Sequence, residues 1–257
     1  MTEMLLRALN ITKRYGAFTA LSGVSFDISK GEVVAVVGPN GAGKTTLVNT
    51  LSGLFVPDEG GVMFEGRPVA GLGASALALR GLARSFQLVT IYPSFTVAEM
   101  ISVGAFARAG QTFRLLRPAA TCRREQAQVR EVAAAFGLEH RLETTCSALS
   151  QGEKKLVDIA SALTLRPRLM LLDEPTSGIS SADKDRIMET LLAAAQRLGV
   201  ESLVLVEHDM ELIARYATRV IVLKAGSLVA DMPPDAFFRD PEVIDTLVGK
   251  VPHNALG

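Results

Sequence analysis

Three short apolar runs stand out in the pattern of hydrophobic and polar positions: Val33–Val37, Leu169–Leu172 and Leu203–Val206. None of them alternates with polar residues, and β-branched or large aliphatic side chains fill each one. Such runs are typical of parallel strands that are covered on both faces. The pattern therefore predicts an α/β fold with a buried parallel sheet.

Other segments alternate and predict antiparallel strands. Residues 5–11 alternate loosely, Tyr15-Gly16 forms a turn, and 21–28 place Val24, Phe26 and Ile28 on one face. We expect these strands to form an antiparallel edge beside the parallel core. Short hairpins are also expected at 62–68 and at 220–230, where Ala225-Gly226 supplies the turn.

Between residues 97 and 149 strand patterns vanish, and alanine and charged residues increase. Thr96 and Glu99 fit a capping box at the start of a helix, and residues 123–136 carry apolar side chains at helical spacing. This segment predicts an inserted helical subdomain. Its basic cluster is interpreted as a solvated face, with contact to lipid headgroups as the alternative; the cluster consists of Arg114, Arg117, Arg123 and Arg124.

A glycine-rich loop follows the first apolar run and leads into a short helix that ends before Gly53. The loop fits the P-loop pattern G-x-x-x-x-G-K-[ST]. Its glycines allow backbone N–H groups to surround a phosphate, and the helix start adds partial positive charge. Lys44 is expected to reach the β- and γ-phosphates, and Thr45 to ligate Mg²⁺. The nucleotide-binding residues expected here are Gly38, Pro39, Asn40, Gly41, Ala42, Gly43, Lys44, Thr45 and Thr46.

Polar residues follow the other two apolar runs directly. Asp173 is placed to hold Mg²⁺, either directly or through water, and Glu174 to orient or deprotonate an attacking water. The third run is followed by Glu207, His208 and Asp209. A lone histidine is more often structural, but His208 lies at the carboxyl end of a core strand, where open α/β sheets bind ligands. Gln87 ends a short strand predicted over 83–87 and is of interest for the same reason. Tyr15 either stacks on an adenine ring or is an ordinary core or surface tyrosine.

A second candidate anion site opens the helix that follows Leu149. Ser150 and Glu153 fit a capping box, which alone explains the residues. Ser150 and Gly152 at a helix start also present N–H groups, a hydroxyl and the positive end of the helix dipole to an anion. Two anion sites in one chain indicate that two copies meet over one nucleotide.

The composition narrows the class of protein. The 257 residues are 48% hydrophobic and 21% charged, which suits one large domain or a core with one inserted subdomain. With 27 basic and 27 acidic residues, the zero net charge does not favour nucleic acid as the main partner. Two cysteines, Cys122 and Cys146, favour a reducing compartment and two ordinary thiols. No apolar run is long enough to span a membrane. If this protein works at a membrane, we expect a different chain to supply the membrane-spanning segments.

Taken in order, these motifs resemble the ABC ATPase family over nearly the whole chain. By this resemblance, Tyr15 stacks on adenine, Lys44 and Thr45 are the Walker A residues, and Asp173 is the Walker B residue. The same resemblance implies that Glu174 is the catalytic base, His208 the γ-phosphate switch, and Gln87 the Q-loop residue that senses Mg²⁺ and touches the permease. It implies that Ser150 and Gly152 contact the γ-phosphate of the ATP bound to the opposing subunit. It also implies that Asp183 is a D-loop residue across the dimer.

The resemblance implies a P-loop NTPase (RecA-like) core with an antiparallel β subdomain and an inserted α-helical subdomain. A single ABC ATPase domain is expected over 1–250. Its core and β subdomain would take 1–87 and 163–230, the helical subdomain about 88–162, and a helical tail 231–257.

Within the family, several stretches look like importers of the branched-chain amino-acid type: 84–87, 95–99, 206–210, the insertion near 105–125 and the tail at 240–244. This resemblance implies ATP and Mg²⁺ as ligands, transmembrane permease subunits as partners, and a periplasmic solute-binding protein as an indirect one. It also implies a homodimer or a heterodimer with a paralogous ATPase, peripheral at the cytoplasmic face of the inner membrane. No nucleic acid is expected; the alternative is a soluble ABC ATPase acting on nucleic acid or the ribosome.

The signature departs from the family's usual Leu-Ser-Gly-Gly-Gln, because Gln151 replaces its first glycine and Glu153 its glutamine. Glu153 places a negative charge near a triphosphate unless the carboxylate is held by its own cap. The hypothesis is competent but slower hydrolysis. A non-hydrolysing scaffold would need a defective Glu174 or His208, and both residues are present.

Overall fold

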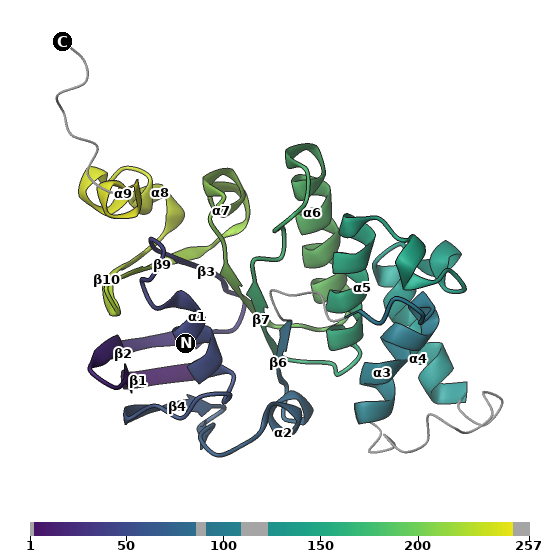
Figure 1. The fold of residues 1–257 in the computed structure, drawn as a ribbon, viewed down its shortest axis with the longest axis horizontal. Coiled ribbons are helices and arrows are strands. Elements are labelled where there is room, and N and C mark those ends of the chain that lie inside the picture. Colours follow the sequence, from purple (N-terminus) through teal and green to yellow (C-terminus); the bar gives the residue numbers. More distant parts are fainter. Residues whose placement is uncertain (1–2, 86–90, 109–122, 249–257) are drawn as a thin grey trace, which may run out of the picture. The chain divides into compact units, whose positions relative to one another are not determined.

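The computed structural model describes residues 3–85, 91–108 and 123–248. The chain divides into two compact units (Figure 1). One consists of Met1–Ala74 with Ser202–Gly257, and the other of Ser75–Glu201. Four residues singled out from the sequence lie outside the described residues: Gln87, Arg114, Arg117 and Cys122. The domain boundaries expected from the sequence stay a prediction.

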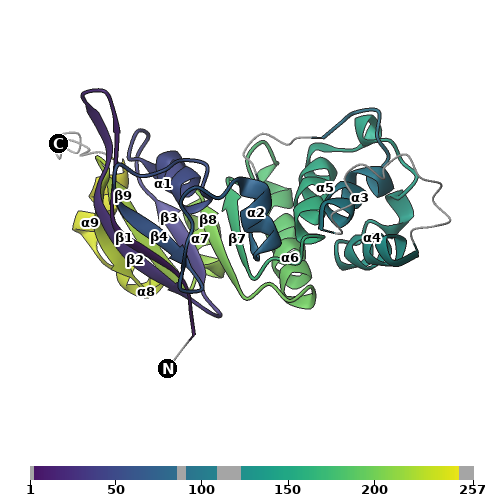
Figure 2. The ribbon, with the colours of Figure 1, turned by 90° about the horizontal axis from the view of Figure 1, so that it is seen from below.

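The first unit contains an antiparallel sheet in the order β2-β1-β4-β5. Figure 2 labels β1, β2 and β4 of this sheet. Its strands are β1 (Met4–Tyr15), β2 (Phe18–Ser29), β4 (Glu59–Phe64) and β5 (Arg67–Pro68). Val24, Phe26 and Ile28 are all buried, which confirms the face expected from the alternation. The predicted antiparallel edge and the short hairpin at 62–68 are both present.

Strand β1 extends beyond the predicted range 5–11. The register with β2 shifts between Ala8 and Ile11, where Asn10 has a φ of 46° and Leu9 is exposed. Such an irregularity breaks the alternation of side chains while the ladder continues on both sides. The alternation of polar and apolar residues is therefore interrupted at positions where the backbone still forms a β-strand.

A second set of strands in the same unit contains the buried runs. Strand β3 (Val33–Val37) lies between the parallel strands β8 (Ser202–Val206) and β9 (Arg219–Lys224). Strand β10 (Ser227–Met232) pairs antiparallel with β9. Ala225 and Gly226 have φ values of 47° and 79°, as a two-residue hairpin turn with the strand's twist requires. The expected closing hairpin is thus confirmed.

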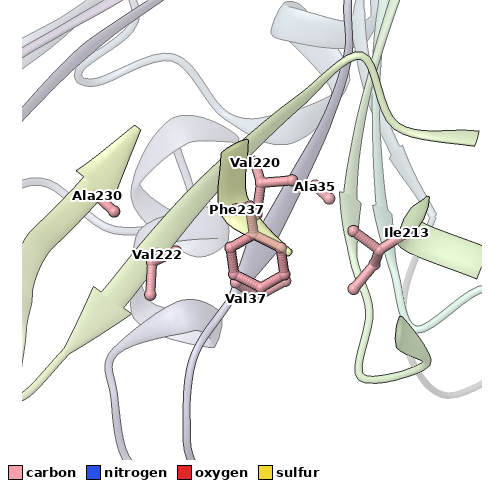
Figure 3. Packing of buried hydrophobic residues seen from close by; sticks show 7 residues of the cluster. All are labelled: Ala35, Val37, Ile213, Val220, Val222, Ala230 and Phe237. Carbon is pink, nitrogen blue, oxygen red and sulfur yellow. The ribbon is translucent and has the colours of Figure 1, made fainter. Parts of the chain in front are cut away.

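The C-terminal segment packs on this sheet. Helices α7 (Met210–Tyr216), α8 (Pro234–Phe237) and α9 (Pro241–Val248) follow β8 and β10. Phe237 is fully buried and belongs to a core cluster with β3 and β9, shown in Figure 3. Val243, Ile244 and Leu247 of α9 pack against the same cluster. Helices α8 and α9 are therefore part of the core of the first unit, whereas Asp231 and Met232, at the start of the predicted tail, belong to strand β10.

The second unit combines a parallel strand pair with helices. Strands β6 (Leu82–Ser85) and β7 (Leu169–Asp173) are parallel, with Arg84 opposite Leu171. The helices are α2 (Ala74–Leu79), α3 (Val97–Arg108), α4 (Arg123–Ala135), α5 (Gln151–Leu163) and α6 (Ser181–Arg197), together with short 3₁₀ turns at Glu139–Arg141 and Cys146–Ala148.

The helices of this unit pack closely through their predicted apolar faces. On α4, Val129, Val132 and Ala133 are buried, and the capping box of Thr96 and Glu99 is formed. At Gly104 on α3, any Cβ would overlap Ser161 and Thr164 of α5. The predicted helical segment is confirmed in the part of it that the structure describes. Of the residues in the basic cluster, the structure describes Arg123 and Arg124, and both are exposed. Cys146 is a buried free thiol.

Candidate functional site

The P-loop connects the end of β3 to helix α1 (Lys44–Leu51) and needs glycine at two close approaches. A Cβ at Gly38 would overlap the carbonyl oxygen of Leu223 in β9, and one at Gly43 would lie 2.5 Å from the carbonyl oxygen of Ala20 in β2. Gly41 has a φ of 80° and open space where a Cβ would stand. The loop is thus pressed against the sheets at both ends and open in the middle, as a phosphate cradle requires.

Further hydrogen bonds hold the loop in place. The N–H of Gly226 donates to the carbonyl of Ala42 at 3.1 Å, and the N–H of Ser22 donates to Gly226 at 2.9 Å. The ammonium of Lys44 is largely buried and donates to the carbonyls of Gly38 (2.7 Å) and Pro39 (3.0 Å). Lys44 therefore lies folded over its own loop, and an anion entering the cradle exchanges these carbonyls for phosphate oxygens.

The exposed side of the P-loop carries Asn40, Gly41 and Thr45. Thr46 is half-buried in the first turn of α1, and its carbonyl accepts a hydrogen bond from the Thr50 hydroxyl at 2.8 Å. Helix α1 starts at Lys44, within the P-loop motif itself. Gly43 is its N-cap with a φ of 102°, so the helix dipole begins at the loop itself.

Tyr15 ends β1 in the same unit as the P-loop and is 47% exposed. It pairs with Phe18 across the hairpin, its ring meets the edge of Phe55 at 6.2 Å, and the Lys13 ammonium lies 5.9 Å from its ring centre. The ring is neither a core tyrosine nor freely rotating. A face that stays exposed while neighbours fix the ring is suited to stacking.

His208 follows β8 and so lies at the same strand ends as the P-loop, because Val36 of β3 pairs in parallel with Val206 of β8. Its backbone N–H donates to the carboxylate of Glu207 at 3.3 Å, and Glu207 is buried. Asp209 caps helix α7 by accepting from Glu211 and Leu212. The first unit thus carries Tyr15, the P-loop and His208.

In the second unit, Asp173 ends β7 and is buried. The guanidinium of Arg84 donates to its Oδ2 at 2.9 Å. Burial lowers the pKa of the Arg84 guanidinium, and the charge and hydrogen bond of Asp173 oppose that shift. Glu174, the next residue, has a φ of 48°. A glutamate in the left-handed region carries backbone strain, which structures commonly keep at functional positions.

The signature segment opens helix α5 in the second unit. The Ser150 hydroxyl accepts from the N–H of Glu153, and the Glu153 carboxylate accepts from the N–H of Ser150 at 2.9 Å, which completes the capping box. Arg141 donates to the other Glu153 oxygen at 3.0 Å. Bonding to the Ser150 N–H, together with the Arg141 charge, lowers the pKa of Glu153. The carboxylate is therefore held by its own cap, which is the exception stated for a negative charge near the triphosphate, and slower hydrolysis stays a hypothesis.

Gly152 lies in the first turn of α5, where an added Cβ would be 3.3 Å from the Ile187 side chain of α6. Asp183, in the first turn of α6, accepts from the Ser180 hydroxyl at 2.7 Å and from Arg186 at 3.1 Å. The second unit thus carries Asp173, Glu174, Ser150, Gly152 and Asp183. Gln87 lies outside the described residues, so its role stays a prediction.

Sequence reasoning missed two residues of the site. Arg84 is a charged residue inside a short buried strand, where an arginine requires a partner; its position beside Asp173 depends on the pairing of β6 with β7. Arg141 lies in an irregular turn, and no local pattern connects it with Glu153, so only the packing of the unit brings them together.

The described part of the chain holds no cluster of three or more His, Cys, Asp or Glu side chains suited to a metal. Each unit offers one oxygen donor by itself: the exposed Thr45 hydroxyl in the first unit and the Asp173 carboxylate in the second. These hard oxygen atoms fit Mg²⁺, which commonly takes one or two protein oxygens and completes its shell with water and nucleotide phosphates.

Among the described residues, no helix is long and apolar enough to cross a membrane.

A strand, a glycine-tight P-loop and a helix define a P-loop nucleotide-binding protein. A histidine follows a paired parallel strand of the same unit, and two acids stand at the end of β7 in the other unit. Comparison with known proteins gives the family. The ABC transporter family model matches residues 21–177. The chain is 29% identical to the high-affinity branched-chain amino acid transport ATP-binding protein BraF of Pseudomonas aeruginosa, covering 97% of this chain and all of that protein.

It is 30% identical to the corresponding LivG protein of Salmonella typhimurium, again over 97% of this chain and all of that one. Among solved structures, it resembles the dimeric post-hydrolysis state of the ATP-binding cassette MJ0796 bound to ADP and Pi. The TM-score is 0.74 with 27% identity, over 90% of this chain and 99% of that one. The chain belongs to the ABC transporter family. It is an ATP-binding subunit with ATPase activity, and the expected fold is confirmed.

Proposed function

We propose that this chain hydrolyses ATP to power import of branched-chain or other hydrophobic amino acids, or related small carboxylates. The observation that carries the proposal is the end-to-end similarity to branched-chain amino acid transport ATP-binding proteins. The importer-type stretches of the sequence support the same cargo class. The chain would bind transmembrane permease subunits at the cytoplasmic face of the inner membrane, and a periplasmic solute-binding protein would deliver the cargo.

In this proposal the P-loop holds the phosphates, Lys44 moves from its loop carbonyls to the β- and γ-phosphates, and Tyr15 stacks on the adenine. Thr45, Gln87 and Asp173 are the residues that would hold Mg²⁺, whose charge would offset that of the phosphates. Glu174 would accept a proton from the attacking water, and His208 would contact the γ-phosphate. Catalysis would then consist mainly of positioning and electrostatic stabilisation.

The nucleotide would lie between two cassettes, the second being a copy of this chain or a paralogue. Ser150 and Gly152 of one cassette would donate to the γ-phosphate held by the P-loop of the other, with Asp183 near the dimer contact. The Ser150 hydroxyl accepts the N–H of Glu153 in the cap and also interacts with the Glu153 carboxylate, and its proton would turn to the γ-phosphate when that anion is bound. The dimeric cassette bound to ADP and Pi supports this arrangement by analogy.

ATP would favour the closed dimer because its phosphates contact both halves, and hydrolysis would remove that bridge. The permease would convert closing and opening into alternating access. The alternative of a soluble ABC ATPase acting on nucleic acid or the ribosome is not favoured, since the relatives are transport subunits and the net charge is zero.

The test is Glu174→Gln in the assembled transporter, with the exposed Glu189→Gln on α6 as matched control. We expect Glu174→Gln to bind ATP with unchanged affinity and to lose turnover and amino-acid uptake, while the control keeps both. Retained hydrolysis in Glu174→Gln would remove Glu174 from its role. Normal hydrolysis that drives no uptake of any hydrophobic amino acid or small carboxylate would refute the proposed cargo.

A further inference from the structure

The carboxylate of Asp173 is paired with a positively charged side chain of the same unit, the guanidinium of Arg84. Arg84 and Asp173 come from the paired parallel strands β6 and β7, and Nη2 of the guanidinium lies 2.9 Å from Oδ2. The two side chains are only 8% and 3% exposed. This is a buried ion pair, with water largely excluded from both partners.

The surroundings explain why the pair exists. The four residues of β7 before Asp173, Leu169 to Leu172, are fully buried, and Leu82 and Ala83 of β6 are buried beside them. A carboxylate in such surroundings needs a compensating charge, because the protein interior solvates an isolated ion poorly. Arg84 supplies that charge from within the same unit.

We propose that Arg84 is a positioning residue that acts as the counter-cation of Asp173 and keeps divalent metal off this carboxylate until nucleotide is bound. The inference rests on the proposed role of Asp173 toward Mg²⁺. A metal ion approaching Asp173 alone meets a guanidinium at hydrogen-bonding distance, and the repulsion is strong in a poorly screened site. Mg²⁺ also gives up its water reluctantly, so one carboxylate that is already paired offers it little.

In the proposed function, the phosphates of a bound nucleotide would change this balance, because they would add negative charge and further ligands for a metal held by Asp173. The metal would therefore enter with the nucleotide. In the nucleotide-free chain, Arg84 would hold the carboxylate in place. A purely structural ion pair predicts something else: loss of Arg84 would lower the melting temperature and leave the affinity for metal unchanged.

The experiment is a titration of the nucleotide-free, full-length protein with Mn²⁺, followed by electron paramagnetic resonance. We expect Arg84→Gln to bind Mn²⁺ about tenfold or more tightly than wild type, since the uncompensated carboxylate becomes a cation site. Arg84→Gln/Asp173→Asn should lose this gain, and Arg84→Lys, which keeps the charge, should stay near wild type. Equal Mn²⁺ affinity in wild type and Arg84→Gln, or a gain that survives Asp173→Asn, would overturn the inference.

A thermal measurement covers the case in which Arg84→Gln folds poorly. The melting temperature of this variant is measured with and without Mg²⁺, again without nucleotide. The inference expects Mg²⁺ to raise it and to leave wild type unchanged, because a ligand stabilises the state that binds it. No Mg²⁺ effect on the variant would leave a structural ion pair only. MgATP hydrolysis by wild type in the same preparation reports separately on the proposed function.

Discussion

Arg141 and Glu153 form an ion pair at the start of the signature helix, with 3.0 Å between Nε and Oε1. The other carboxylate oxygen accepts the N–H of Ser150. Both oxygens of Glu153 are therefore engaged inside the unit, and the negative charge is compensated beside the residues that would face a γ-phosphate. A glutamate in the signature is compatible with anion binding on these terms.

This compensation predicts a rescue. Arg141→Gln should raise the KM for ATP of the assembled transporter several-fold, because the uncompensated Glu153 charge weakens the positive end of the helix dipole. Glu153→Gln alone should stay near wild type, and Arg141→Gln/Glu153→Gln should recover most of the lost affinity. The measurement is the KM and kcat of all three variants. If the double variant is as impaired as Arg141→Gln, the effect of Arg141 does not pass through the charge of Glu153.

The same residue predicts a dependence of stability on pH. The folded-state pKa of Glu153 is lowered from its ordinary value of 4.5, so its contribution is present above that value. The contribution is lost as pH falls below 4.5 toward the folded-state pKa. The difference in melting temperature between wild type and Glu153→Gln should be largest near neutral pH and shrink in acid. A difference that stays constant or grows in acid would contradict this sign.

The glycines of the P-loop predict a steric effect that can be separated from backbone strain. Gly38→Ala forces a Cβ into the Leu223 carbonyl, whereas Gly41→Ala, also at positive φ, enters open space. We expect Gly38→Ala to lower the melting temperature and to lose ATP binding. Gly41→Ala should carry only a strain penalty, on the order of 1 kcal/mol. Equal losses of stability in the two variants would mean that the close approach to β9 does not matter.

The C-terminal segment is predicted to stabilise the first unit. Phe237 is fully buried against β3 and β9 (Figure 3), so Phe237→Ala should cost about 3–5 kcal/mol in free energy of unfolding. Its neighbour Phe238 is 38% exposed and meets Phe237 edge-on at 4.9 Å. Phe238→Ala is therefore the matched control, with a clearly smaller loss in chemical denaturation. Equal losses of unfolding free energy in Phe237→Ala and Phe238→Ala would mean that the buried contacts of Phe237 do not stabilise the first unit.

Much of this architecture can be predicted from the sequence, because local patterns determine it. The run at Val33–Val37 has the same bounds as β3, and the capping boxes at Thr96 and Ser150 are formed. The partners of Asp173 and Glu153 could not be predicted, since Arg84 and Arg141 reach them through strand pairing and tertiary packing. The length of β1 was missed because an irregularity near Asn10 interrupts its alternation.

The central claim is that one nucleotide is held by Lys44 of one cassette and Ser150 of another. The most direct measurement mixes two inactive variants of the full chain, Lys44→Ala and Ser150→Phe, and compares the ATPase rate with that of wild type. Each mixed dimer would contain one intact site, and random pairing would restore about a quarter of the wild-type rate. A mixture no more active than the sum of its two parts, while wild type is active, would contradict the account.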